Sequence, residues 1–527
     1  MSARALKLGT RRSALARAQS GAVARELERR HPGLSVELIG IDTRGDKILD
    51  QPLSAVEGKE FFTAEIDAAL LRGDVDFTVH SFKDLALQRD ARLRLAAVPP
   101  REQPHDVVIF AADVRERLAA GETLRIGSSS PRRASFIPEF LQQALPSPDN
   151  QRNEASPARV QLVELRGNVD SRVRRLREPR GSSRHLDGIV LAFAGIARLF
   201  ADEAAGMQLR TLLEGLPRLV LPLSVCPPAP AQGALAIECR QDDVLTSQLL
   251  QSLDDDSTRE ATHQERALLS ARGGGCQQRF GAVRFALPRL GALRYTRAAD
   301  EHDGRLCIGE TELQWTPAEP LPPITGVVRA WDGSRAAAAA AVPIPEGIAR
   351  AAERLSGTRA LFVAHRRALP QDDRLHIPAH AHVWVPGVRT WLALARQGVW
   401  VEGCADGLGI SAIGSLLAER WLQLPPLPQW LVLTHAEALE GWPEGGALAT
   451  YRLGEVAEEP GADATHLWWA SGAQFSHWAA NQPSAHAHLV RTHACGPGRT
   501  YEHLRAAGVQ NLRMFPHVEQ WRAWLGL

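Results

Sequence analysis

The sequence predicts an α/β protein of three or four domains, and three observations lead to this prediction. The chain has 527 residues, more than one hydrophobic core usually organises. Short apolar runs alternate with stretches of helical periodicity along most of its length. Polar and basic residues follow several apolar runs directly. Because open α/β sheets bind ligands at the carboxyl ends of their strands, this order indicates mostly parallel sheets with sites at those ends.

In the first segment, predicted strands and helices alternate. Strands are expected at Ala5–Gly9, Leu34–Ile41 and Val75–Val79, and helices at Ser13–Arg30 and Thr63–Leu71. This order of elements implies β-α-β units and a mostly parallel sheet.

A second group of elements follows. Strand Arg125–Gly127 precedes a helix that opens at Ser128–Arg133, and strand Val160–Leu165 precedes a helix that opens at Arg166–Arg172. Between them, Pro146–Pro157 is rich in Ser, Pro, Asn and Asp, a composition that predicts an exposed loop insertion.

The rest of the chain is predicted to contain two further parts. A third unit extends to about Val342, and the alanine run Ala336–Ala341 is predicted to be helical. Pro343–Pro345 is expected to be a linker. The last segment is rich in Trp and His, has no lysine, and again alternates apolar strands with helical stretches.

The composition excludes several classes of protein. The formal net charge is +1, so there is no global attraction to nucleic acid or to a membrane surface. No apolar run approaches the roughly 20 residues of a membrane span, and the N-terminus lacks the apolar core of a secretory signal. The six cysteines form no CxxC pair, so we expect no metal site, no disulfide framework and a cytoplasmic location. We also expect a monomer.

Lysine is rare in this chain, and its few copies lie near the N-terminus. The four lysines among the 61 basic residues are Lys7, Lys47, Lys59 and Lys83. Lysine is a compact, flexible point charge and arginine a planar fork, so lysines near loop ends are candidates for a role that arginine cannot fill. Lys59 and Lys83 meet this condition. The alternative for Lys83 is drift in a GC-rich coding sequence.

Four basic clusters are predicted at turns between strands and helices. They are Thr10–Ser13, Ser128–Arg133, Arg166–Arg172 and Gly195–Arg198. The N-termini of helices favour anions, and arginine adds bidentate recognition of carboxylates or phosphates. The clusters therefore predict a site for a phosphate or for several carboxylates, against the alternative of solvated surface arginines.

Two carboxylates and one cysteine are candidates for chemistry in such a basic cleft. Asp84 follows the predicted strand Val75–Val79, and Asp46 is the second candidate. Each could transfer protons or stabilise a cation, or it could simply pair with a basic neighbour. Cys276 follows three glycines, so its sulfur could meet a bulky group as a nucleophile or as an attachment site.

Taken in order, these motifs resemble hydroxymethylbilane synthase, also called porphobilinogen deaminase, over about residues 4–310. The motifs are Gly9–Ser13, Thr43–Asp46, Gly58-Lys59 with Phe62, His80–Asp84, Ser129–Arg133, Leu165–Asn168, Ala194–Arg198, Ala231–Ala234 and Gly274–Gln277. Each is weak alone, but the ordered set is specific.

The resemblance implies a fold with two periplasmic-binding-protein-like α/β domains, a smaller α+β domain that carries the cofactor cysteine, and a C-terminal α/β segment. The expected boundaries are 1–103 with 218–241 for the first domain, 104–217 for the second, 242–345 for the third and 346–527 for the last segment. Two-domain clefts of this kind also serve in solute binders, so a non-catalytic anion binder is the alternative function.

The resemblance also implies the reaction. A dipyrromethane cofactor is joined by a thioether to Cys276, porphobilinogen loses ammonia, and the growing chain attacks the resulting electrophile. Four additions precede hydrolytic release of the linear tetrapyrrole. Asp84 is implied as the catalytic acid and base. The residues implied in cofactor binding are Cys276, Lys83, Ser129, Ser130, Arg132, Arg133, Asp46 and Lys59. Those implied in substrate binding are Arg11, Ser13, Phe62, Arg166, Arg172, Arg198 and Gln232.

The C-terminal segment more weakly resembles uroporphyrinogen-III synthase, which closes the linear tetrapyrrole into a ring. The similarity lies at Thr450–Arg452, His466–Ala473 and Cys495–Gly508, and it implies roles for Tyr451, Ser471 and Thr500. The alternative is a structural appendage, because similarity of fold does not establish function.

Overall fold

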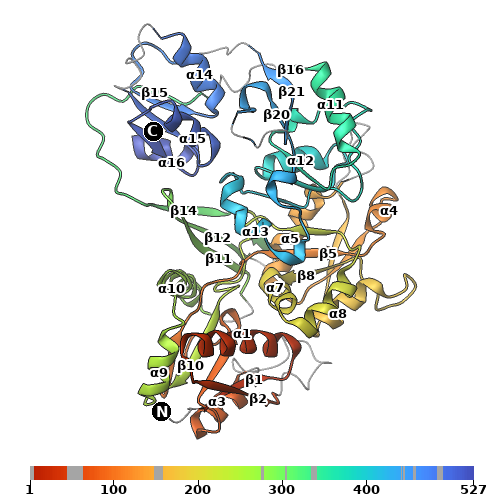
Figure 1. Cartoon of the computed structure of the whole chain (residues 1–527), viewed down its shortest axis with the longest axis vertical. Coiled ribbons are helices and arrows are strands. Elements are labelled where there is room, and N and C mark those ends of the chain that lie inside the picture. The colour runs from red at the N-terminus through yellow and green to blue at the C-terminus, as the bar shows by residue number, and fades with distance from the viewer. Residues whose placement is uncertain are drawn as a thin grey trace. The chain divides into compact units, whose positions relative to one another are not determined.

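The computed structural model describes residues 5–43, 63–146, 158–274, 278–302, 305–333, 341–440, 442, 446–454, 459–482 and 491–527. The fold is mixed α/β, as predicted, and its strands form five sheets (Figure 1). Contacts divide the chain into two compact units. The first comprises residues 1–142, 157–284 and 294–313, and the second comprises residues 143–156, 285–293 and 314–527. Among the described residues, no helix combines the length and apolar character needed to cross a bilayer.

The first sheet is built on the N-terminal segment and one returning strand. Its strands are β1 (Ala5–Arg11), β2 (Ser35–Ile41), β3 (Phe77–Ser81), β4 (Leu93–Ala97) and β10 (Leu235–Arg240), in the order β2-β1-β3-β10-β4. β1 runs parallel to β2 and β3, whereas β10 is antiparallel to β3 and β4. Helices α1 (Ala14–Arg30) and α3 (Ala64–Arg72) and the 3-10 turn η2 (Phe82–Asp84) connect these strands. The sheet is therefore mixed rather than mostly parallel, since two of these four strand pairs are antiparallel.

Helix α1 shows how local sequence positions this part of the fold. The Ser13 hydroxyl accepts a hydrogen bond from the backbone N–H of Ala16 at 3.3 Å and so caps the helix N-terminus. Val23 and Leu27 are buried and pack against β1 and β3 in one hydrophobic cluster. Because the cap begins directly after β1, the basic residues of Thr10–Ser13 lie at a strand-to-helix turn, as predicted.

The second sheet is formed by the next segment of the chain. Its strands are β5 (Asp106–Phe110), β6 (Leu124–Gly127), β7 (Val160–Val163), β8 (Gly188–Ala192) and β9 (Arg218–Val220), in the order β7-β6-β8-β5-β9. Its helices are α4 (Val114–Ala119), α5 (Pro131–Ala144), α6 (Val169–Arg174), α7 (Phe193–Ala201) and α8 (Glu203–Leu213), and the 3-10 turn η4 spans Arg175–Arg177. The predicted loop insertion at 146–157 lies, apart from Pro146, outside the described residues.

A third group of elements follows β10. Helices α9 (Val244–Gln251) and α10 (Asp256–Ala271) precede strands β11 (Phe280–Leu287), β12 (Gly291–His302), β13 (Arg305–Ile308) and β14 (Glu312–Pro317). The sheet runs β11-β12-β13, and β14 also pairs with β12.

The last segment contains two further sheets. The six-stranded sheet comprises β16 (Ala341–Pro343), β17 (Ala360–Val363), β18 (His382–Val385), β19 (Gly403–Cys404), β20 (Leu431–His435) and β21 (Ala447–Leu453), in the order β16-β21-β20-β17-β18-β19. Helices α11 (Pro345–Leu355), α12 (Val388–Ala395) and α13 (Gly414–Leu417) accompany it, with 3-10 turns η6 (Arg366–Ala368), η7 (Ile410–Ile413), η8 (Arg420–Leu422), η9 (Leu427–Gln429) and η10 (Ala436–Ala438).

The remaining sheet is parallel and smaller. It comprises β15 (Ala330–Trp331), β22 (His466–Trp469), β23 (Thr492–Cys495) and β24 (Leu512–Met514), with helices α14 (Gly472–Ala480), α15 (Arg499–Ala506) and α16 (Val518–Leu525). The expectation of a linker at Pro343–Pro345 is wrong, because Pro343 ends an edge strand and Pro345 begins α11. Both positions tolerate proline, since edge strands and first helical turns need no donor there.

Candidate active site

The turn η2 carries the two residues that the sequence singles out. It follows β3 directly, because antiparallel pairing with β10 extends that strand to Ser81, two residues beyond the predicted end. Phe82 is buried against Val98 and Ala234 and anchors the turn. Lys83 is partly buried and Asp84 is exposed. The hydrophobic anchor therefore leaves the carboxylate of Asp84 accessible.

Lys83 is held from the neighbouring segment of the chain. Its Nζ donates to Oε1 of Gln232 at 3.1 Å. Burial lowers the pKa of Lys83 below its usual value, and the adjacent charge of Asp84 opposes this change. The site thus contains a lysine with weakened solvation beside an exposed carboxylate.

Gln232 links Lys83 to a buried carboxylate. Its Nε2 donates to Oδ1 of Asp106 at 2.9 Å and to the carbonyl of Pro104 at 2.8 Å. The following residue, Gly233, has a φ of 89°, and a Cβ there would lie 2.4 Å from the carbonyl oxygen of Glu102. This close approach requires glycine. The amide of Gln232 is consequently fixed between the end of β3 and the start of β5.

Asp106 organises the two buried arginines at the start of α5. Nη2 of Arg132 donates to Oδ2 at 2.7 Å, and Nη2 of Arg133 donates to Oδ1 at the same distance. Burial alone would raise the pKa of Asp106, but the charges of Arg132 and Arg133 outweigh burial and hold the pKa well below its usual range. The single negative charge of Asp106 therefore neutralises only part of the positive charge of Arg132 and Arg133.

Several donors in this cluster are left for a ligand. Within the described residues, Nε of Arg132, Nε of Arg133 and Nη2 of Arg166 are buried without a hydrogen-bond partner. The side chains of Arg132 and Arg133 are 4% and 8% exposed. Buried donors without partners are costly, so these three donors are suited to bind an anion. Carboxylates of an acidic cofactor such as a dipyrromethane fit these donors.

Arg172 belongs to the same electrostatic field. It lies on α6, and its Nε donates to the carbonyl of Gly167 at 2.7 Å. Burial and then the charge of Arg133 lower the pKa of Arg172 to about 10, and the charge of Asp84 opposes them. The charge of Arg166 also acts on it. The charges of Asp84, Arg133 and Arg166 therefore all act on Arg172.

The predicted hydroxyl groups mostly serve the backbone. Ser13 caps α1, Ser129 donates to the carbonyl of Leu165, and the Ser130 hydroxyl accepts from the N–H of Arg133 at 3.4 Å. Their local role is to shape the turns that present the arginines.

Two further predicted arginines lie on β1 and α7. Arg11 ends β1 and is partly buried. Arg198 was predicted in a turn but lies inside α7, since the helix already begins at Phe193. Its Nη2 donates to the carbonyl of Gly233 at 2.5 Å, and burial lowers its pKa to about 10. Arg198 thus contacts the segment that carries Gln232.

Four predicted site residues lie outside the described residues. They are Asp46, Lys59, Phe62 and Cys276. The described chain reaches Gly274, where an added Cβ would lie 2.7 Å from Cδ1 of Leu87. The residue three positions after Asp84 therefore contacts the segment that leads toward the cysteine in sequence.

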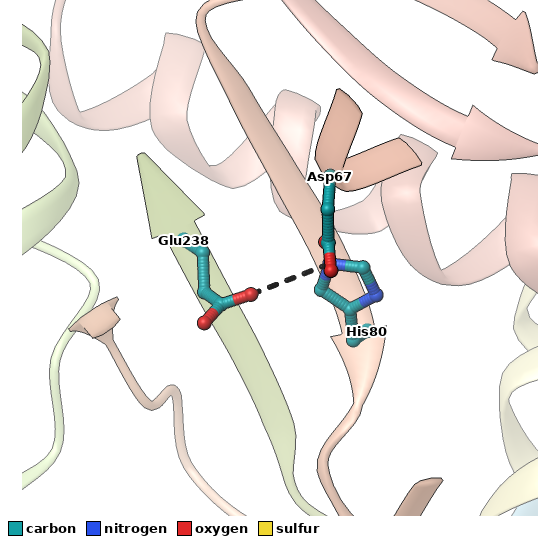
Figure 2. Close-up of side chains that lie close together, drawn as sticks. All are labelled: Asp67, His80 and Glu238. Carbon is teal, nitrogen blue, oxygen red and sulfur yellow. Dashed lines mark ion pairs between the residues drawn. The ribbon is translucent and has the colours of Figure 1, made fainter. Parts of the chain in front are cut away.

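A second buried polar cluster joins α3, β3 and β10, and sequence reasoning missed its carboxylates. Figure 2 shows Asp67, His80 and Glu238, whose potential ligand atoms all lie within 4.8 Å of one another. Nε2 of His80 lies 3.6 Å from Oε2 of Glu238, and burial lowers the pKa of His80. The only available sequence signal was an acidic residue inside the apolar run that forms β10.

Arg89 balances the charge of this cluster. Its guanidinium donates to both oxygens of Asp67 at 2.8 and 2.9 Å and to both oxygens of Glu238 at 2.7 and 3.0 Å. The cation that these carboxylates bind is therefore an arginine, and the arrangement is a structural network that ties α3, β3 and β10 together.

The three C-terminal candidates lie on different elements of the last two sheets. Tyr451 lies on β21 and is 3% exposed, Ser471 caps α14 by accepting from the N–H of Gln474 at 3.2 Å, and Thr500 lies in the first turn of α15. The ring of Tyr451 lies 5.6 Å from that of His435 and 6.5 Å from that of His365. These two histidines were not predicted.

Similarity to known proteins covers the first half of the chain. Residues 6–248 match the family described as "Porphobilinogen deaminase, dipyromethane cofactor binding domain". The porphobilinogen deaminase of Syntrophotalea carbinolica is 40% identical over 277 residues, which are 53% of this chain and 77% of that protein. That of Geobacter metallireducens is 39% identical and covers 53% of this chain and 76% of its own length. Porphobilinogen deaminase 1 of Streptomyces avermitilis is 41% identical, and the match covers 54% of this chain and 79% of that protein.

Solved structures add little to this comparison. The methionine-binding protein MetQ covers 50% of this chain and 95% of its own, with 14% identity and a TM-score of 0.28. A score this low carries no argument.

Proposed function

The chain belongs to the porphobilinogen deaminase family, and from this premise we propose that it acts as a hydroxymethylbilane synthase. Enzymes of this family are transferases. In the proposed reaction, four porphobilinogen molecules are deaminated and joined head to tail on a covalent dipyrromethane, and the linear tetrapyrrole is released. The dipyrromethane, attached at Cys276, would supply the pyrrole end that is extended.

The observation that carries this proposal is an exposed carboxylate, Asp84, whose charge acts on Arg172 within a cluster of buried arginines. Arg132, Arg133 and Arg166 each keep one buried donor without a partner among the described residues. Each pyrrole ring would bring two carboxylates, and the arginine forks are suited to hold them.

Asp84 would transfer protons and stabilise positive charge in the reaction. A carboxylate is the natural partner for a pyrrole N–H that becomes positively charged. Asp84 is the last residue of η2 and is exposed, while Lys83 beside it donates to Gln232. Lys83 would hold a carboxylate of the cofactor, and Ser129 and Ser130 would keep the turn of Arg132 and Arg133 in shape.

We predict that Asp84→Asn lowers turnover of porphobilinogen by roughly 10²-fold or more, because removal of a positioned acid and base typically costs ~10²–10⁴-fold. The purified variant should keep its folding cooperativity and its circular dichroism spectrum. Asp90→Asn is the matched control, since Asp90 is a nearby carboxylate that pairs with Arg92 at 2.6 Å. Near-normal turnover in Asp84→Asn would contradict the assignment of Asp84 as the catalytic acid and base.

The alternative function, a non-catalytic anion binder, uses the same arginines. It requires neither turnover nor an exposed carboxylate among them. Release of ammonia from porphobilinogen by the full chain separates the two functions: a binder would take up porphobilinogen without releasing ammonia.

A second activity is favoured by the arrangement of the six-stranded sheet. After β17 the chain continues to β18 and β19 on one side, and it returns to β20 and β21 on the other. The carboxyl ends of β17 and β20 thus form a topological switch point, where open α/β sheets bind ligands. His365 follows β17, and His435 ends β20.

The groups at this switch point suit an acidic ligand. Nδ1 of His365 accepts from the N–H of Arg367 at 3.2 Å, so a neutral ring carries its proton on Nε2 as a donor. Burial, followed by the charges of Arg367 and Arg366, lowers the pKa of His365 to about 4. Burial raises the pKa of Tyr451 to about 12, so the phenol stays protonated. We propose that this segment, with Ser471 and Thr500, cyclises the linear tetrapyrrole to uroporphyrinogen III.

Analysis of the product isomers tests this second proposal. The full chain supplied with porphobilinogen should yield mainly the type III ring, and Tyr451→Phe should shift the product to type I without changing porphobilinogen consumption. Tyr295→Phe, outside both C-terminal sheets on β12, is the control. If the unaltered chain yields the type I ring, the C-terminal segment does not cyclise its product.

We also propose that the enzyme works as a cytoplasmic monomer on small molecules. None of the five cysteines that the structure describes lies in a disulfide, which suits a reducing compartment.

A further inference from the structure

Arg266, on α10, donates hydrogen bonds to the turn that carries Asp84. Its Nη1 donates to the carbonyls of Phe82 and Leu85, both at 3.0 Å, and its Nη2 donates to the carbonyl of Ala86 at 2.8 Å. The guanidinium also lies over the Phe82 ring, with Cζ 4.5 Å from its centroid. One side chain therefore contacts the backbone on both sides of Lys83 and Asp84.

The burial of Phe82 and the hydrogen bond from Lys83 to Gln232 also hold this turn, but its own backbone hydrogen bonding is weak. η2 is only three residues long, and its internal hydrogen bond, from the N–H of Leu85 to the carbonyl of Phe82, is 3.3 Å. Short 3-10 turns have poor hydrogen-bond geometry. Without Arg266, the carbonyls of Leu85 and Ala86 would lose a charged donor, and the carboxylate of Asp84 would be positioned less precisely.

The preceding residue of α10 holds a different part of the site. Glu265 is completely buried and accepts from the N–H of Ala231 at 2.7 Å and from Arg101 at 2.6 and 2.9 Å. Nε of Arg101 donates in turn to the carbonyl of Gln232 at 2.8 Å. Adjacent residues of one helix thus fix the segment of Gln232 and the turn of Asp84.

The same helix leads in sequence to the cysteine expected to carry the cofactor. α10 ends at Ala271, and Gly274 lies close to Leu87, which follows the turn that Arg266 binds. We propose that Arg266 is a positioning residue of the transferase, which sets the Asp84 turn against the helix that precedes Cys276. This inference rests on the proposed function, because it assigns Asp84 to the chemistry.

The test compares two arginines of α10 in the full-length protein. Arg259 lies two turns earlier, pairs with Asp254 at 2.7 Å and donates to the carbonyl of Ala96 at 3.2 Å, so Arg259→Ala is the matched control. For Arg266→Ala, Arg266→Lys and the control, kcat and KM for porphobilinogen, the cofactor content by intact mass, and Tm are measured. Guanidinium ion is then added to Arg266→Ala.

We expect Arg266→Ala to lose about 10²-fold in kcat at nearly unchanged KM, since a misplacement of about 1 Å costs on this order. Cofactor content should stay at the level of the control. Guanidinium should restore part of the rate in Arg266→Ala and none in Arg259→Ala. The kcat of Arg266→Lys should lie between those of Arg266→Ala and the unaltered chain. An ammonium can donate to the carbonyls but lacks the planar fork of arginine.

Three results would overturn the inference. They are an unchanged kcat in Arg266→Ala, an equal loss of kcat in Arg259→Ala, or a loss that follows the cofactor content and does not respond to guanidinium. Asp84→Asn is assayed in parallel. Normal turnover there contradicts the proposed function itself, whereas a slow Asp84→Asn beside a normal Arg266→Ala contradicts only the role of Arg266.

Discussion

At the scale of single residues, the site depends on the buried carboxylate of Asp106. Asp106 is completely buried and receives hydrogen bonds from Arg132, Arg133 and Gln232. Burying an arginine costs free energy unless it is paired, so Asp106 allows Arg132 and Arg133 both to be buried. Their remaining donors can then face an anionic ligand.

We predict that Asp106→Asn lowers the stability of the second sheet by about 3–5 kcal/mol at pH 7, because one partner of a buried ion pair is removed. The measurement is hydrogen exchange of peptides from β5 and β8. All 13 tryptophans lie between Trp315 and Trp524, so tryptophan fluorescence reports the second unit and serves as an internal control.

The effect of Asp106→Asn should also depend on pH with a defined sign. The pKa of Asp106 is depressed in the folded chain, so its contribution is complete above its unfolded pKa of ~3.9 and is lost as the pH falls below that value. The difference in the free energy of unfolding between Asp106→Asn and the unaltered chain should therefore become smaller below about pH 4. Asp300→Asn, which breaks an exposed pair with Arg272, should cost less than about 1 kcal/mol, and an equal cost would contradict the account.

The role of Asp106 could not be predicted from one sequence. It opens an apolar run and has the local signature of a residue at a strand start. Its partners Arg132 and Gln232 lie 26 and 126 positions further along the chain. Nothing in local periodicity brings such positions together, whereas Arg132 and Arg133 were visible because basic residues at a helix start have a local meaning.

At the scale of elements, predictions held where a local signal fixes the boundary. Ser13 marks the start of α1 because its hydroxyl can cap a helix, and Pro131 marks that of α5 because proline suits the first helical position. The end of β3 was missed by two residues, since its length is set by pairing with β10 far along the chain. Elements whose limits come from such pairing need the fold to define them.

The return of the chain from the second sheet shows the same limit. Residues 218–241 were expected in the first domain, but Arg218–Val220 pairs with β5 in the second sheet, and only β10 joins the first. A three-residue strand has too little periodicity to reveal its partner. The segment between the two strands carries Gln232, which places a contact residue of the site where the chain passes from one sheet to the other.

At the scale of the whole molecule, the family match accounts for only part of the chain. The relatives cover 53–54% of it, and the two C-terminal sheets form the core of the second compact unit. The proposals for the two units are therefore independent: the first depends on Asp84 and its arginines, and the second depends on the switch point beside Tyr451.

The most direct test of the central claim is the intact mass of the purified full chain and of Cys276→Ala. We predict that the unaltered chain carries an added mass equal to two pyrrole units, and that Cys276→Ala lacks this mass and shows no turnover. A chain of unmodified mass that still binds porphobilinogen would contradict the claim that this arginine-lined site builds a tetrapyrrole on a covalent primer.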